Sequence, residues 1–195
     1  MPVEQLDHAC DAAQLVDARP VYRIDQPRAA DAGTWLIDPV DRPRVDELGG
    51  VAGVIQLLDR HNRDCASIAA RLGVPHHVVP REPLGPFEFL PVRLKRRWRE
   101  VALWWRDERV LVCAEAYGTA AFYRAGDERL GVHPLLRGRP PRLDVHPDVI
   151  LCGHGPGVFD DADAALREAF RTSRRRIPEQ LVSAVRAWRS RPRAR

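Results

Sequence analysis

The sequence of 195 residues has little lysine, methionine and cysteine, and it contains no long hydrophobic run. Its apolar runs stay well below the roughly 20 residues that a membrane-spanning helix needs, which argues against such a helix. Residues 1–8 show neither a basic start nor an apolar stretch, so no secretory signal is visible. We therefore expect a soluble, cytoplasmic protein that does not associate with membranes.

The four cysteines (Cys10, Cys65, Cys113 and Cys152) lie far apart, and no two of them form a Cys-x-x-Cys pair, which argues against a zinc knuckle. Cys113 and Cys152 stand in apolar runs, where a thiol packs like a small hydrophobic side chain. Cys65 borders a polar cluster. Core packing at the start of a helix is the simpler interpretation for it, and a reactive thiol is the alternative.

Lys95 is the single lysine, so nearly all of the positive charge is carried by arginine. The formal net charge is +4, but residues 171–195 hold nine arginines against one acid, Glu179. A basic tail of this kind can bind nucleic acid or an acidic protein partner. The near absence of lysine indicates that the arginines can also reflect coding bias. Nucleic acid therefore stays a secondary possibility, and the oligomeric state is open.

The length and the hydrophobic share of 45% suit one soluble, layered α/β or α+β domain. Apolar runs predict strands at 21–24, 34–38, 51–58, 76–79 and 149–152, and a hairpin of residues 100–105 and 110–114. Helices are predicted over 64–72, where Gly73 ends the helix, over 160–170 and over 178–188. The proline-rich residues 80–91 are predicted to form a loop, and residues 131–143 to be irregular.

Three of these predicted strands end in residues that can carry chemistry. Residues 51–58 lead into Asp59-Arg-His-Asn-Arg-Asp64, residues 110–114 lead into Glu115, and residues 149–152 lead into Gly153-His154-Gly155. Buried strands of α/β proteins commonly present reactive groups at their ends. The three strand ends therefore predict one site.

In this order of elements the chain resembles the metallo-β-lactamase fold superfamily over residues 20–172. The resemblance rests on Leu36-Ile37-Asp38, on an apolar strand that enters a six-residue motif, on Leu72 to Pro75 after a helix, and on the ends at Glu115 and Gly-His-Gly. It implies an α+β fold, an αββα sandwich in a single domain. Residues 1–19 would then be an N-terminal extension, and residues 173–195 a basic C-terminal helix and tail.

The family motif is His-x-His-x-Asp-His, followed by a later His, a metal-bridging Asp and a last His. Aligned with it, Asp59 and Asp64 fall on the first and last His of the motif, His61 on the second His, and Arg63 on the Asp. Glu115 then falls on the bridging Asp and His154 on the final His. Residues 81–132 contain no histidine for the later position. Sliding the motif by one residue places Asp64 on its Asp, but it preserves fewer ligand-type residues.

Arg63 argues against a dinuclear centre, since a guanidinium stays protonated and cannot coordinate a metal. One metal remains possible: Asp59, His61, Glu115 and His154 offer donors suited to zinc, iron or manganese. In that case Asp64 would be a catalytic base or orienting residue. The alternative is metal-free, with Arg60 and Arg63 pairing with the carboxylates. We expect no bound metal, with one zinc, iron or manganese ion as the alternative.

Three functions follow from this pattern. The first interpretation is a protein whose degenerate metal site binds an acidic small molecule or a partner's carboxylate through Arg60, Arg63 and His154. The alternative is a mononuclear hydrolase of a small ester, thioester or phosphoester, with Asp64 and Arg63 as the candidate catalytic residues. The third is association with nucleic acid through the arginine-rich tail.

Overall fold

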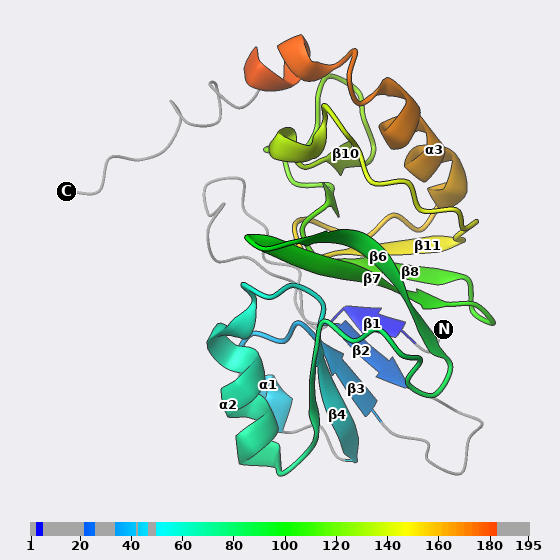
Figure 1. The fold of residues 1–195 in the computed structure, drawn as a ribbon. Helices are drawn as coiled ribbons and strands as arrows, with labels where there is room; N and C mark the ends of the chain where they lie inside the picture. Colours follow the sequence, from blue (N-terminus) through cyan, green and yellow to red (C-terminus); the bar gives the residue numbers. More distant parts are fainter. Residues whose placement is uncertain (1–2, 6–21, 26–33, 42, 47–49, 183–195) are drawn as a thin grey trace.

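The computed structural model describes residues 3–5, 22–25, 34–41, 43–46 and 50–182 (Figure 1). One sheet has the strand order β1-β2-β3-β4-β5. Its strands are β1 (Val3–Gln5), β2 (Tyr22–Asp25), β3 (Thr34–Ile37), β4 (Val51–Gln56) and β5 (His76–Val78). The pairs β1–β2 and β2–β3 are antiparallel, whereas β3–β4 and β4–β5 are parallel.

A second sheet has the order β11-β8-β7-β6. It consists of β6 (Phe87–Lys95), β7 (Trp98–Trp105), β8 (Val110–Cys113) and β11 (Val149–Cys152). Only β8 and β11 pair in parallel. A short antiparallel pair, β9 (Tyr117–Gly118) with β10 (Gly131–Val132), follows the end of β8.

The helices lie outside the two sheets (Figure 1). They are α1 (Pro43–Asp46), α2 (Asn62–Leu72) and α3 (Ala162–Thr172), with a 3₁₀ turn η1 (Pro134–Leu136). Figure 1 places α1 and α2 at one end and α3 at the other, with both sheets between them. The predicted αββα sandwich is therefore confirmed. None of the helices in the described ranges has the length and apolar character that a membrane crossing requires.

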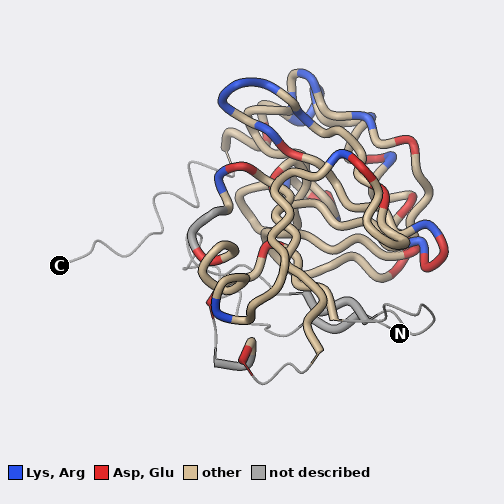
Figure 2. The backbone as a smooth tube through the Cα atoms, turned by 60° about the horizontal axis from the view of Figure 1, so that its bottom comes forward, with Lys and Arg blue, Asp and Glu red and all other residues tan. Residues whose placement is uncertain are grey.

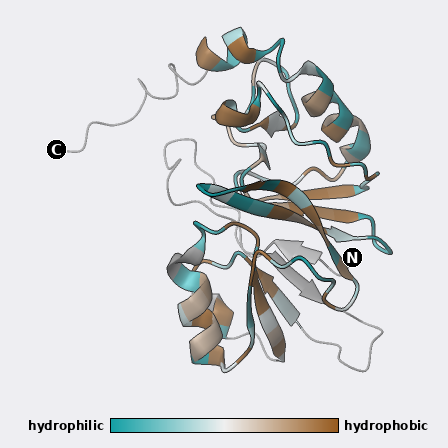
Figure 3. Cartoon of the chain, viewed as in Figure 1, coloured by the Kyte–Doolittle hydropathy of each residue, from teal (hydrophilic) through white to brown (hydrophobic). Residues whose placement is uncertain are grey.

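The main hydrophobic core lies between the sheets and continues to α3. It joins Ile37 and Ile55 of the first sheet to Leu103 and Leu111 of the second, and it reaches Leu166. In Figure 3 the strands β8 and β11 are hydrophobic along their length, which agrees with the burial of all their residues. Strands covered on both faces are expected to be continuously apolar.

Most local predictions agree with the structure, but residues 131–143, predicted to be irregular, contain β10 and η1. Gly73 ends α2 in the left-handed conformation with φ 66°, as the sequence predicts. The predicted loop at residues 80–91 is partly wrong, because β6 starts at Phe87 and pairs with β7. A proline can stand at Pro91 because β6 is an edge strand and its register shifts at that point.

Both ends of the chain contribute described residues to the fold. Residues 3–5 form β1, which pairs with β2. Beyond α3, Ser173 and Gln180 are buried and residues 177–182 are helical. The remainder of the helix predicted over 178–188, and the arginine-rich tail after it, lie outside the described residues. The three-part division at residues 19 and 172 stays a prediction.

The cysteines of the second sheet are buried as predicted. Cys113 and Cys152 are register partners on β8 and β11, and neither forms a disulfide. Burial raises the pKa of both thiols, and it raises the pKa of Cys152 to about 12. Cys65 is also buried, with its Sγ 3.1 Å from the carbonyl oxygen of His61.

We expect these three thiols to resist alkylation in the folded protein, because burial blocks access to all of them and raises the pKa of Cys113 and Cys152, and only the thiolate reacts. Iodoacetamide at pH 8, followed by peptide mass spectrometry, should label Cys65, Cys113 and Cys152 only after unfolding in urea. Rapid labelling of Cys113 or Cys152 in the native protein would contradict the buried positions of β8 and β11.

Candidate metal site

Glu115 lies at the centre of a group of histidines. It follows β8, and its carboxylate oxygens are 3.4 Å from His61 Nε2, 3.8 Å from His154 Nε2 and 3.9 Å from His133 Nε2. The carboxyl side chain is 21% exposed, so solvent reaches it only from one side. Four titratable groups from four separate segments therefore converge on one point.

Three members of this group can hold a metal ion. One ligand atom each from His61, Glu115 and His154 lies within 4.8 Å of the other two. Donors bound to zinc at 2.0–2.1 Å in a tetrahedral arrangement lie about 3.3 Å apart. The shortest nitrogen-to-oxygen distances are close to this value, 3.4 Å from His61 to Oε2 of Glu115 and 3.8 Å from His154 to Oε1, although they involve different carboxylate oxygens. Two imidazoles and one carboxylate fit zinc or iron in chemistry, and donor atoms within 4.8 Å of one another can close on one ion.

Asp38 fixes the orientation of His61. It follows β3 in a left-handed conformation, φ 45°, and its Oδ1 accepts a hydrogen bond from the backbone N–H of Leu57. Its Oδ2 lies 3.3 Å from His61 Nδ1. A carboxylate there favours a proton on Nδ1, so that Nε2, which faces Glu115, is the nitrogen available to a metal ion; in the protonated imidazole the same Nε2 donates to Glu115. Carboxylate–histidine pairs of this kind orient metal ligands.

His133 has a different role from the other two histidines. Its Nδ1 accepts the backbone N–H of Leu135 at the start of η1, so the neutral ring carries its proton on Nε2, toward Glu115. Burial lowers the pKa of His133, the charge of Glu115 raises it, and the charge of Arg60 lowers it further. His133 therefore faces the carboxylate with its protonated nitrogen, which has no lone pair for a metal, and it is not one of the three clustered donors.

The histidines keep Glu115 ionised. Burial alone would raise its pKa, but the hydrogen bond from His61 and the charges of His154, His61 and His133 outweigh burial. The resulting pKa is about 2. The side chain is thus a carboxylate at neutral pH, the state that a metal ligand requires.

Glu100 holds the backbone that carries Glu115. This side chain is fully buried on β7, and its Oε1 accepts the backbone N–H groups of Glu115 and Ala116, both at 2.8 Å. Its Oε2 accepts the Trp98 indole N–H at 2.7 Å. Burial raises the pKa of Glu100, while these hydrogen bonds oppose the rise. The Trp98 ring in turn meets His133 edge-on at 4.9 Å.

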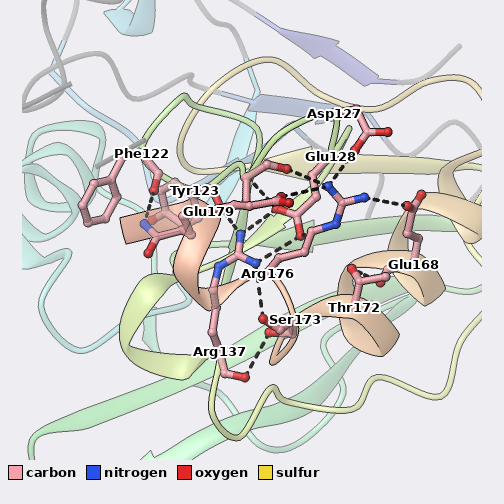
Figure 4. Close-up of polar contacts among 12 residues, drawn as sticks. Phe122, Tyr123, Asp127, Glu128, Arg137, Glu168, Thr172, Ser173, Arg176 and Glu179 are labelled. Carbon is pink, nitrogen blue, oxygen red and sulfur yellow. Dashed lines mark hydrogen bonds and ion pairs between the residues drawn. The ribbon is translucent and has the colours of Figure 1, made fainter. Parts of the chain in front are cut away.

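Tyr123 covers the other side of the site. Its ring stacks on His154 at 5.5 Å and meets His133 edge-on at 5.6 Å. Figure 4 shows how this segment is fixed: Arg137 donates to the Tyr123 carbonyl and to both carboxylate oxygens of Glu128. Arg137 and Glu128 are both fully buried. The buried ion pair of Arg137 and Glu128 thus holds the segment that places Tyr123 beside His154.

The other residues predicted for the site are not in this group. Asp59, predicted as a ligand, is not one of the three clustered donors, and its backbone N–H bonds to Arg99. Asp64 instead accepts a hydrogen bond from the Asp41 backbone N–H. Arg60 packs its guanidinium over the Trp98 ring at 4.6 Å rather than against a carboxylate of the group. The side chain of Arg63 lies outside the described residues.

Sequence reasoning missed His133, Asp38 as a partner of His61, Glu100 and Tyr123. His133 lies one residue beyond the stretch 81–132 that contains no histidine, in a segment without strand or helix periodicity. Glu100 reads as an ordinary polar residue of a hairpin. For Asp38 a signal existed, because it ends an apolar strand as Glu115 does.

Comparisons with known proteins give a fold and no sequence relative. No protein-family model matches the sequence, and curated protein sequences give no match. Among solved structures, a fragment of a protein described as diflavin flavoprotein A 5 from Nostoc sp. PCC 7120 superposes with a TM-score of 0.55. The match has 12% identity and covers 91% of this chain and 92% of that chain.

A metallo-β-lactamase from Hirschia baltica superposes with a TM-score of 0.51. It has 9% identity, and the match covers 89% of this chain and 98% of that chain. Both matches extend over nearly the whole chain at very low identity, so they concern the course of the backbone and not the chemistry. Together with the αββα layers and the strand ends that meet at Glu115, they show that the chain has the metallo-β-lactamase fold.

Proposed function

We propose that the chain is a mononuclear metal-dependent hydrolase that acts on a small ester, thioester or phosphoester. The observation that carries the proposal is the group of His61, Glu115 and His154, whose donor atoms lie within 4.8 Å of one another. Asp38 behind His61 supports it, because a carboxylate on the second ring nitrogen is the usual partner of a metal-binding histidine. The fold alone would not support an activity.

The donor set supports one metal ion rather than two. Within the described residues no second group of three candidate donors occurs. His133 uses Nδ1 as a hydrogen-bond acceptor and directs the other nitrogen at Glu115, which already serves the first site. Two-metal hydrolysis needs a second set of ligands about 3.5–4 Å from the first ion.

Three protein ligands leave a coordination position open, and an ion bound there supplies a Lewis acid that activates water. The surrounding residues have separate tasks. Asp38 sets the tautomer of His61, and His133 directs its Nε2 toward Oε1 of Glu115 at 3.9 Å, an ion-pair distance rather than a hydrogen bond. The guanidinium of Arg60, exposed above Trp98 and close enough to lower the pKa of His133, would attract an acidic substrate.

Metal-free binding of an acidic ligand is the second candidate function. Arg60 favours it, because an exposed guanidinium stacked on an indole ring keeps its hydrogen-bond donors available. The two functions differ in their dependence on a metal ion. Hydrolysis would require the ion, whereas ligand binding through Arg60 alone would not.

The proposed function is tested with the full chain after chelation and reloading with zinc, iron(II) or manganese. Hydrolysis of 4-nitrophenyl acetate, a thioester and 4-nitrophenyl phosphate is followed for the wild type, His154→Ala and the exposed-site control His146→Ala. We expect activity toward one of these classes that depends on the metal, survives in His146→Ala and falls at least about 100-fold in His154→Ala. Equal rates in His154→Ala and wild type, or no metal-dependent rate on any substrate, would refute the proposal.

The variant Asp38→Asn is expected to weaken metal binding by about 10- to 100-fold, the usual cost of losing a carboxylate behind a ligating histidine. Asparagine tolerates the left-handed conformation of residue 38, so the fold should persist. Competition with a fluorescent zinc chelator measures the change in Kd. The matched control is Asp148→Asn, which removes a surface carboxylate paired with Arg109. The same Kd in all three proteins would show that Asp38 does not orient His61.

A further inference from the structure

A cavity lies apart from the residues of the candidate metal site. It has a volume of about 820 Å³ and opens between residues 139–146, which precede β11, and the second half of α3 with the turn after it. Neither Glu115 nor any of the three histidines around it lines this cavity. Small-molecule sites usually have volumes of roughly 300–1,000 Å³, so the cavity can enclose a ligand of that size.

The rim of the cavity is strongly cationic. Its arginines are Arg139, Arg142, Arg167, Arg171 and Arg174. Asp144 is the only acid among the lining residues, and its contact with Arg142, at 3.6 Å, joins two exposed side chains. An exposed ion pair of this kind contributes little to stability, so Asp144 does not hold Arg142 firmly. Figure 2 shows several basic stretches of backbone at the upper end of the molecule, and others elsewhere on it.

Two of these arginines are not neutralised by the protein. Within the described part of the chain, no carboxylate lies within ion-pair distance of Arg139 or Arg171, and both are exposed. Arg167 is paired with Asp163, and Arg174 donates to the carbonyl oxygen of Gly138. Arg139 and Arg171 come from two different segments that line the cavity, one from the loop before β11 and one from α3. Their forked donors suit a carboxylate or phosphate group.

The interior of the cavity is apolar. Leu143 and Leu166 line it as buried side chains, and Phe170 lines it with 38% of its surface exposed. Phe170 lies on the hydrophobic face of α3, yet it has no complete cover from the rest of the described fold. An exposed aromatic ring between arginines favours a ligand that joins an apolar body to an anionic head.

We infer that this cavity binds a single anionic amphiphile from solution: an acyl or alkyl chain that carries a carboxylate or phosphate group. The apolar chain covers Phe170 and Leu143, and the head group lies between Arg139 and Arg171. A concave site with this volume fits a chain of one molecule better than a flat membrane surface. The site is separate from the metal, so binding does not depend on the proposed hydrolysis.

Isothermal titration of the full chain with dodecyl phosphate below its micelle concentration, in the presence of EDTA, tests the inference. We expect saturable binding of one molecule per chain, with inorganic phosphate and dodecyltrimethylammonium each at least tenfold weaker. Arg139→Ala/Arg171→Ala should weaken binding at least tenfold. The control Arg96→Ala/Arg97→Ala, which removes the same charge from the exposed turn between β6 and β7, should leave Kd unchanged.

Three outcomes would overturn the inference. They are the absence of saturable binding, equal Kd values in the two double variants, and equal affinity for the cationic amphiphile. A substitution of the apolar wall, Phe170→Ser, gives an independent check, since it should weaken dodecyl phosphate and leave inorganic phosphate unaffected. Circular dichroism of each variant confirms that the arginine changes, which are on the surface, leave the fold intact.

Discussion

Replacing Glu115 with glutamine is expected to lower the affinity for zinc or iron(II) by more than about 100-fold. The loss of affinity should exceed the 10- to 100-fold loss expected for Asp38→Asn, which changes a residue behind a ligand. Glu115→Gln instead removes the only carboxylate among the three clustered donors. An amide is neutral and a weaker ligand for either ion. Competition with a chelator of known affinity measures the change.

Glutamine keeps the volume of the side chain, and the backbone N–H of residue 115 still bonds to Glu100, so the fold should tolerate the substitution. Glu88→Gln is the matched control, since that carboxylate pairs with Arg106 on the surface of β6 and β7. Metal affinity that falls equally in both variants would point to a general loss of negative charge. Affinity that is unchanged in Glu115→Gln would place the metal elsewhere.

Arg137→Met is expected to destabilise the folded protein by about 3–5 kcal/mol, because it leaves the fully buried carboxylate of Glu128 without its main counter-charge. The variant also removes donors from the carbonyl oxygens of Tyr123 and Ser173 (Figure 4). Urea unfolding followed by tryptophan fluorescence measures the difference in the free energy of unfolding.

The control for this prediction is Arg106→Met, which breaks an exposed ion pair with Glu88. It should cost less than about 1 kcal/mol. The double variant Arg137→Met/Glu128→Leu should recover part of the loss, because no charge is then left buried without a partner. If Arg137→Met proves no more harmful than Arg106→Met, the buried network does not hold the segment that carries Tyr123.

Apolar strands with polar ends predicted a layered α/β or α+β domain, and the resemblance to the metallo-β-lactamase superfamily implied the αββα sandwich. The same pattern identified His61, Glu115 and His154, since each stands just beyond a buried strand. Asp59 obeys the same rule and was therefore predicted with them, but the turn after β4 directs only His61 into the group of donors. Strand ends predict the neighbourhood of a residue and not the direction of its side chain.

Contacts between residues far apart in the sequence could not be predicted from local patterns. His133 and Tyr123 are brought to the site by an irregular segment whose course depends on Arg137 and Glu128, and nothing in the local pattern shows that these two residues pair. The first half of β6 was predicted to be a loop because Pro86 precedes the strand and Pro91 stands within it. Its pairing with β7 supplies the energy that local propensity does not.

The central claim is that His61, Glu115 and His154 bind one divalent metal ion. Its most direct test is the metal content of the full chain after loading with excess zinc, iron(II) or manganese and dialysis against metal-free buffer, measured by plasma mass spectrometry. We predict one equivalent per chain for at least one of these metals in the wild type, and close to none in His61→Ala/His154→Ala. No bound metal under any of these conditions, or two tightly bound ions per chain, would contradict it.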